Sequence, residues 1–140
     1  MERVRSKDGP PPSSLQEIRP LVLIDTTQLA LERSISGAAQ RHEALAANIA
    51  NASTPGYRRV DVDFHGALAA ALGTGDKATV EHTSFTTQAD QAVGVTQADG
   101  NSIDVDNESA KLAANALEQQ AAVSVLKART AIIRSALGVA

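Results

Sequence analysis

The sequence predicts a mainly helical protein in which two long terminal helices pair as an antiparallel coiled coil, with a small mixed, β-containing middle segment between them. Apolar residues recur at alternating spacings of four and three over residues 24–52 and again over 112–137, which is the heptad pattern of helices that pack along a seam. A Pro-Gly pair at 55–56 separates the first helix from the middle segment. Two seams in one chain predict that the helices pack against each other.

The chain is expected to divide into one helical domain and two less regular parts. The coiled-coil domain comprises 24–56 and 104–140, and the middle segment comprises 57–103. Residues 1–23 are mostly polar and proline-bearing, so we expect a disordered N-terminal extension. The apolar run Leu21–Ile24 is too short for the apolar core of a cleaved signal peptide, and no run approaches the ~20 residues that cross a bilayer.

Composition limits the stability of an isolated molecule. The 140 residues suffice for one domain, and 43% of them are hydrophobic, but only 2% are aromatic and many are alanine. Because a buried Leu or Phe contributes roughly 1.5–3 kcal/mol and an alanine much less, we expect a thin core and further burial against neighbours. A net charge of -3 argues against a nucleic-acid surface, which is normally basic. The absence of cysteine excludes disulfides and thiol chemistry.

The first helix is predicted over 27–51. The side-chain oxygens of residues 25–27 (Asp-Thr-Thr) favour a helix start there. Gly37 costs about 1 kcal/mol relative to Ala unless a neighbouring helix needs a close approach there. We expect His42, a polar interruption of the seam, to be partly buried. The seam consists of Ile24, Gln28, Leu31, Ile35, Ala38, His42, Leu45, Ile49 and Ala52.

The C-terminal helix is predicted to begin near Asp104, Asp106 or Asn107, whose side chains suit an N-cap, and to stop at Gly138. Glu108 would lie favourably near the positive end of the helix dipole. The helix carries a seam and a second apolar stripe on the adjacent face, which predicts two partners: the first helix and a neighbouring molecule. The seam is Leu112, Ala116, Gln119, Val123, Leu126, Thr130, Ile133 and Leu137, and the stripe is Leu117, Ala121, Val125, Ala128 and Ile132.

The middle segment is predicted to mix strand and helix. Residues 57–64 alternate in part in polarity and predict a strand or extended segment that covers one side of the helices. The alanine-rich residues 65–72 predict a short helix that ends at a Gly-Thr-Gly sequence. Residues 79–87 are rich in Thr, Val and Phe and predict a further strand. Residues 88–101 are rich in turn-forming residues.

No metal or cofactor site is expected. His42, His65 and His82 are too scattered for a local site, and Ala46 stands where a zinc-protease helix would place its second histidine. The acidic run 99–108 lacks the glycine that a calcium loop requires. Turn and capping roles are the expected use of these acidic residues.

Catalysis is not expected either. Asp61 and Asp63 would lie about 6.6 Å apart on one face of a strand, and paired carboxylates can perform acid–base chemistry. Nothing else marks a pocket, so we favour a solvated or arginine-paired face. The Gly-Thr-Gly-Asp-Lys sequence at 73–77 lacks the spacing and the Ser/Thr of a phosphate-binding loop.

The most distinctive stretch is 47–57, Ala-Asn-Ile-Ala-Asn-Ala-Ser-Thr-Pro-Gly-Tyr. Pro55 suits position i+1 of a type II turn, and Gly56 can adopt the positive φ that position i+2 requires. Pro55 also disfavours helix at the preceding residue and so helps to end the first helix. Asn48 and Asn51 share a helical face and can bond to the departing chain or to a neighbour. The alternative is a helix stop with no further role.

This stretch strongly resembles the N-terminal signature of bacterial flagellar rod, hook and hook-associated axial proteins. Residues 58–64 and the Asp-Gly-Asn-Ser-Ile-Asp-Val-Asp-Asn-Glu sequence at 99–108 are similar to the proximal rod members of that family. The resemblance covers roughly 24–137 and is weakest over 73–98. The matching signature residues are Asn48, Asn51, Thr54, Pro55, Gly56 and Tyr57.

The resemblance implies a structural, non-enzymatic subunit of the basal-body rod, which spans the periplasm and transmits motor torque towards the hook. In that family the terminal helices stack with those of neighbouring subunits around an export channel, and subunits leave through the flagellar type III export apparatus without signal cleavage. The implied partners are other rod subunits, the adaptor that joins rod to basal ring, and the export apparatus. The expected assembly interface is Leu31, Ile35, Leu45, Ile49, Leu112, Leu117, Val123, Leu126, Ile133 and Leu137.

A cytosolic antiparallel coiled-coil adaptor or regulator is the alternative. Such a protein would share the two helices, but it gives no reason for the asparagine-rich run before the Pro-Gly turn. Members of the resembled family usually begin near the position of Ile24, so 1–23 is expected to be an extension of the family pattern.

Overall fold

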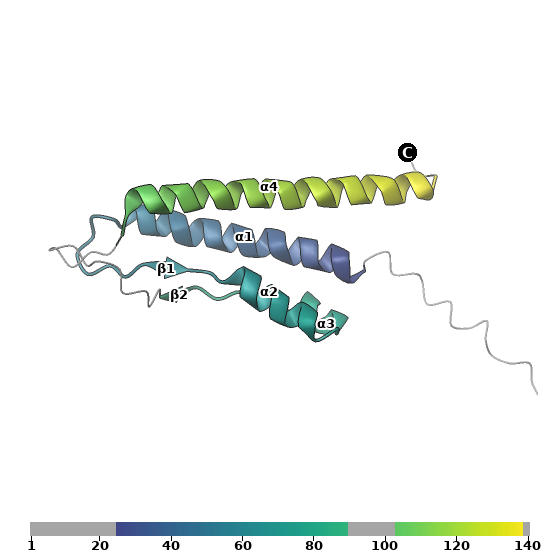
Figure 1. The fold of residues 1–140 in the computed structure, drawn as a ribbon, viewed down its shortest axis with the longest axis horizontal. Helices are drawn as coiled ribbons and strands as arrows, with labels where there is room; N and C mark the ends of the chain where they lie inside the picture. Colours follow the sequence, from purple (N-terminus) through teal and green to yellow (C-terminus); the bar gives the residue numbers. More distant parts are fainter. Residues whose placement is uncertain (1–24, 90–102, 139–140) are drawn as a thin grey trace, which may run out of the picture.

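The computed structural model describes residues 25–89 and 103–138. Helix α1 pairs antiparallel with α4, and the middle segment packs against the opposite side of α1 (Figure 1). The expected fold class is therefore confirmed. The elements in chain order are α1 (Thr26–Ala50), β1 (Val60–Asp61), α2 (Phe64–Gly73), α3 (Lys77–Glu81), β2 (Gln88–Ala89) and α4 (Val105–Ala136). The expectations for 1–23 and for most of 88–101 lie outside the described residues.

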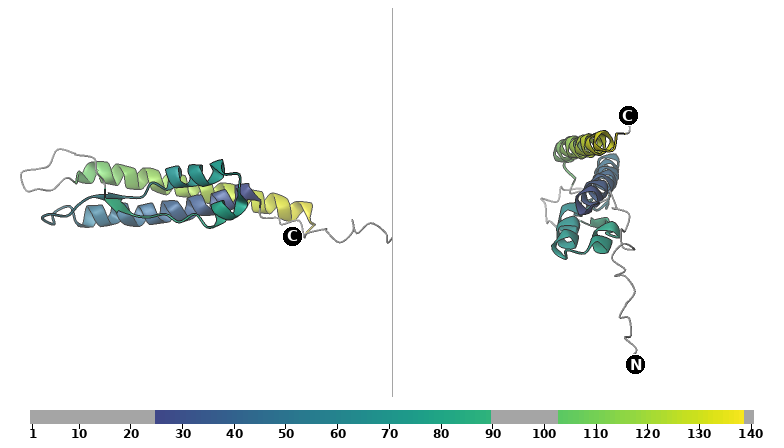
Figure 2. Two further views of the ribbon diagram at one scale, coloured as in Figure 1. Left: turned by 90° about the horizontal axis from the view of Figure 1, so that it is seen from below. Right: turned by 90° about the vertical axis from the view of Figure 1, so that its right-hand side faces the viewer.

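Helix α1 lies at the centre of the molecule, between α4 and the middle segment (Figure 2). Its start is fixed by Asp25, whose Oδ1 accepts a hydrogen bond from the backbone N–H of Gln28 at 2.9 Å. Both predicted boundaries hold to within one residue. The expectation for His42 was wrong, because that side chain is exposed. Position 42 falls on a side of α1 that is covered neither by α4 nor by the described part of the middle segment.

Helix α4 is the longest element and extends beyond the first residue of α1 (Figure 1). Asp104 is its N-cap and accepts from the backbone N–H groups of Asp106 at 3.0 Å and Asn107 at 3.1 Å. The helix ends as predicted at Gly138, which adopts a φ of 67°. At that end the Arg129 side chain contacts the carboxylate of Asp25. None of the helices in the described part of the chain has the length and apolar character needed to span a bilayer.

The middle segment differs from the prediction in its strands. Only Val60–Asp61 form a strand, paired antiparallel with Gln88–Ala89, because Asp63 caps α2 and directs the chain into a helix from Phe64. The short helix predicted over 65–72 is confirmed. The strand predicted over 79–87 is wrong. Asp76 accepts from the N–H groups of two following residues and starts α3 instead.

The core is small and lies between α1 and the middle segment. Its aromatic part is an edge-to-face pair, Phe64 and Phe85, with ring centroids 6.1 Å apart. Phe64 reaches this position because Gly37 leaves room for its ring, so the predicted alternative of a close approach at Gly37 is confirmed. The two clusters of buried apolar residues are Ala38, Ala44, Val62, Phe64 and Phe85, and Leu29, Ala71 and Val80.

Replacing Gly37 with Ala should destabilise the fold. A Cβ there would lie 2.5 Å from the Cβ of Phe64. Overpacking of this kind costs about 1–3 kcal/mol, more than the helix propensity that alanine gains. Thermal unfolding followed by circular dichroism measures the change. Gly73→Ala is the matched control, because a Cβ at Gly73 meets nothing within 4 Å and α2 should be unaffected or slightly stabilised. Equal unfolding midpoints for both variants would contradict the prediction.

Candidate assembly interface

Asn48 connects α1 to the chain that leaves it. Its carboxamide donates to the carbonyl of Val60 at 2.7 Å and accepts from the N–H of Val60 at 2.9 Å, as a neighbouring strand would. The second amide proton bonds Glu108 Oε2 at 2.8 Å, and the hydroxyl of Tyr57 donates to Asn48 Oδ1 at 3.4 Å. Asn48 is fully buried, with 0% of its surface exposed. Every polar position of this side chain is therefore used.

The Pro-Gly turn has the predicted geometry. The N–H of Tyr57 donates to the carbonyl of Thr54 at 3.2 Å, and Gly56 has a φ of 74°. Asn51 caps the end of α1 and donates from its side chain to the carbonyl of Ala47 at 2.8 Å. Asn48 and Asn51 thus bond within the chain, as the sequence allowed, and the exposed turn residues project beyond the helix.

Glu108 is a buried charged residue. From the sequence, we predicted only a favourable interaction with the positive end of the helix dipole. Glu108 has 1% of its surface exposed and accepts from Arg59 Nε at 2.7 Å and from Lys111 Nζ at 3.1 Å. Burial by itself would raise the pKa of Glu108, but the hydrogen bonds it accepts outweigh burial and hold the pKa below its ordinary value. The carboxylate therefore stays charged and joins α4 to the middle segment.

Asp61 continues this network to α1. It accepts from Arg41 Nε at 2.9 Å and from Arg59 Nη2 at 3.0 Å, so positive and negative groups alternate from α1 through β1 to α4. Burial would raise the pKa of Asp61, but these bonds and one from the N–H of Val62 lower it. The prediction of an arginine-paired face is confirmed for Asp61. Asp63 instead caps α2.

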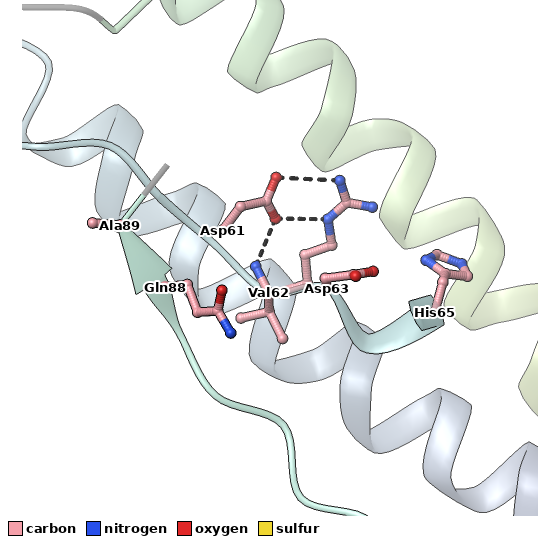
Figure 3. A pocket seen from close by; sticks show the side chains of 7 residues that line it. Asp61, Val62, Asp63, His65, Gln88 and Ala89 are labelled. Atoms are coloured by element: carbon pink, nitrogen blue, oxygen red, sulfur yellow. Dashed lines mark hydrogen bonds and ion pairs between the residues drawn. The ribbon is translucent and has the colours of Figure 1, made fainter. Parts of the chain in front are cut away.

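A polar hollow of about 500 Å³ lies beside this network. Figure 3 shows Asp61 bonded to the guanidinium of Arg41 and to the N–H of Val62, with Gln88 and His65 at the rim. His65 Nε2 lies within bonding distance of a Glu118 carboxylate oxygen. The acidic groups of the hollow already have cationic or backbone partners, so the arrangement holds elements together and does not resemble an acid–base pair poised over a cavity.

The residues expected in the assembly interface fall into three groups by burial. Leu45 of α1 is fully buried. Leu117 and Leu137 are exposed to 69% and 58%. The remaining members are partly buried, namely Leu31, Ile35, Ile49, Leu112, Val123, Leu126 and Ile133.

The second apolar stripe of α4 is uncovered by the rest of the described chain. Leu117, Val125 and Ile132 have exposed fractions of 69%, 53% and 70%. They lie on a helix whose main packing partner among the described elements is α1, with one further side-chain contact from His65 of α2 to Glu118. Exposed apolar side chains arranged along one helix face are typical of a surface that meets another protein.

Sequence reasoning missed Arg59, Glu108 and Asn115 as structural residues. Asn115 is 2% exposed and donates from Nδ2 to the carbonyl of Ala38 at 2.8 Å. One signal was present: Glu108 and Asn115 are seven residues apart, so two polar side chains share a helix face that also has heptad spacing. Their partners lie far away in the sequence and left no such signal.

Comparison with known proteins identifies the family. A family model described as flagella basal body rod protein matches residues 34–58. The chain is 36% identical over 123 residues to the flagellar basal body rod protein FlgB of Escherichia coli (strain K12), covering 74% of this chain and 89% of that protein. It is 34% identical over 116 residues to FlgB of Aeromonas hydrophila, covering 74% and 86%. The chain belongs to the FlgB family. FlgB of Cereibacter sphaeroides is also 34% identical, over 105 residues that cover 69% and 82%.

Membership of the FlgB family confirms the resemblance seen in the sequence. The match at 34–58 spans the second half of α1 and the Pro-Gly turn, where Asn48 organises the fold. The protein is thus a structural subunit of the flagellar basal body rod and associates with other rod components. A cytosolic coiled-coil regulator is not favoured.

Asn48→Ala should cost about 3 kcal/mol or more in the free energy of unfolding. The substitution leaves the N–H and C=O of Val60 and one oxygen of Glu108 without their partner, and each buried unpaired group costs about 1–3 kcal/mol. Urea denaturation measures the loss. Asn107→Ala on the exposed side of α4 is the control and should change stability by less than about 0.5 kcal/mol. A similar, small effect of both substitutions would refute the role of Asn48.

The free energy of unfolding should decrease in acid, and Glu108 should account for part of that decrease. The pKa values of Glu108 and Asp61 in the folded chain lie below the ordinary values of these groups, so the unfolded chain binds more protons as the pH falls towards the ordinary values. Their stabilisation is complete above about pH 5 and is lost as pH falls through the lowered folded-state pKa values. Urea midpoints from about pH 7 to about pH 3 follow this loss.

Glu108→Gln provides the matched test of that pH dependence. The amide keeps the shape but loses the charge-assisted bonds, so we expect a loss of about 2 kcal/mol at neutral pH and a flatter acid profile. Glu81→Gln, at an exposed position of α3, should leave the profile unchanged. An equally steep acid profile in the Glu108 variant would show that Glu108 is not responsible.

Proposed function

We propose that this FlgB family member assembles into the proximal part of the rod through the second apolar stripe of α4, in which Leu117, Val125 and Ile132 are the large side chains. The observation that supports the proposal is the exposure of these three large apolar side chains on the longest helix. Full burial of such a side chain contributes roughly 1.5–3 kcal/mol, so one face covered by a neighbour would add substantially to a small core. Leu137, the exposed C-cap of α4, lies on the seam side of the helix and would offer a neighbour a separate contact.

The seam residues have a different part in this proposal. Leu112, Val123, Leu126 and Ile133 on α4, with the expected α1 residues, would hold the helix pair together within one subunit and leave the stripe for the neighbour. The pair is joined at both ends, by Asn48 with Glu108 and by Asp25 with Arg129. Such a doubly joined pair would resist sliding of one helix along the other, which suits a subunit that transmits torque.

Membership of the FlgB family supports a proposal for the further partners and the route of export. We infer contacts with the adaptor that joins the rod to the basal ring and with the flagellar type III export apparatus, and passage through it without signal cleavage. A chain without cysteine and with a small core is compatible with export in an unfolded state. We also infer a purely structural, non-catalytic role, in which 24–56 and 104–140 form the assembling domain and 57–103 covers α1.

Leu117→Glu and Ile132→Glu should abolish rod incorporation without unfolding the monomer. Both side chains are about 70% exposed, and substitutions at exposed sites usually change stability by less than about 0.5 kcal/mol. A charge in a helix interface, by contrast, would have to be desolvated without a partner. Immunoblots of purified basal bodies and swimming in soft agar measure incorporation.

Leu72→Glu is the matched control. Leu72 is also a large apolar residue, 40% exposed, but it lies on α2, on the opposite side of α1 from α4. This variant should enter basal bodies and support swimming. Normal incorporation of both α4 variants would exclude the stripe as the interface, and equal failure of all three variants would show that the effect is not specific to α4.

A further inference from the structure

We propose that Asn115 and Glu108 are positioning residues that fix the register in which α4 pairs with α1. Both side chains are almost fully buried, with 2% and 1% exposed, and they lie on the same face of α4, seven residues apart. Each reaches across to α1, Asn115 to Ala38 and Glu108 to Asn48. Figure 1 shows the two helices side by side over this length. The effect would operate within a single chain, whatever that chain assembles with.

Asn115 adds less to stability than an apolar residue of its shape would. Its Nδ2 donates to the carbonyl of Ala38 at 2.8 Å, but its Oδ1 is buried without a partner among the described residues. An unpaired buried oxygen is destabilising. The carbonyl of Ala38 lies inside α1 and can bond within the helix without Asn115. The carboxamide therefore favours one alignment of the helices at some expense in stability.

A slipped pairing would lose both polar contacts. Moving α4 by one heptad along α1 would place Leu31 or Leu45 opposite Asn115 in place of Ala38, and a leucine side chain would block the carboxamide from the backbone. The same slip would move Glu108 away from Asn48. Apolar helix interfaces with heptad spacing tolerate such slips, whereas a buried polar residue within such an interface is known to specify register.

Pulsed electron paramagnetic resonance can measure the register directly. The chain has no cysteine, so Glu43→Cys on α1 and Ser124→Cys on α4, both at exposed positions, would carry two unique spin labels. A slip of one heptad changes the axial separation of the labels by about 10 Å. We expect the labelled parent chain to show a single distance.

The test variant is Asn115→Leu with Glu108→Met. Leucine has the branched skeleton of asparagine, Arg59 keeps its bond to Asp61, and Lys111 is partly exposed and can turn to solvent, so the helices should still form. We expect a second population of distances displaced by about 10 Å, with helical content retained. Asn115→Leu alone should unfold at the parent temperature or above it. A merely structural role of Asn115 would instead lower that temperature and leave one distance.

Gln119→Leu is the matched control, since the Gln119 side chain is partly buried on the same helix and makes no hydrogen bond to the described part of the chain. It should keep the single parent distance. A folded double variant that shows only the parent distance would overturn the proposal. If the double variant does not fold, Asn115→Leu alone decides: a broadened distribution supports the proposal, and an unchanged one overturns it.

Discussion

The hydrogen bonds of the Asn48 carboxamide are the interaction on which the rest of the structure depends. They occupy both backbone groups of Val60 and hold Glu108 at the start of α4. One side chain therefore sets the path of the chain after the Pro-Gly turn and the position of the C-terminal helix. Because it is buried, neither contact can be replaced by water without opening the fold. This accounts for an asparagine in an otherwise apolar part of α1.

Small residues on α1 make its central position possible. Gly37 lets the ring of Phe64 approach from the middle segment, and Ala38 lets Asn115 reach the backbone from α4. Larger side chains would separate the layers on either side. The cost is a core with few large apolar groups, so the charged network around Arg59 supplies much of the connection between layers.

Helix α1 covers only one face of α4 and leaves the apolar stripe on the adjacent face exposed. In an isolated chain that stripe is a liability, because exposed apolar side chains favour nonspecific association. In the proposed rod contact it is the surface through which a neighbour would complete the core. Under that proposal, the exposed stripe and the small core have one cause, because part of the apolar surface would be buried only in the assembly.

The sequence by itself determined the features that depend on residues close together in the chain. Asp25, Asp104 and the Pro-Gly turn fixed where helices begin and end, because caps and turns act over a few residues. Only the tertiary structure decided which side chains are buried. His42 is exposed and Glu108 is buried because of how distant parts of the chain pack around them. The strand β1 belongs here too, because it pairs with β2 from a distant part of the chain and contacts α1. The pairing of Arg59 with Glu108 joins residues 49 positions apart, a separation over which no local pattern carries information.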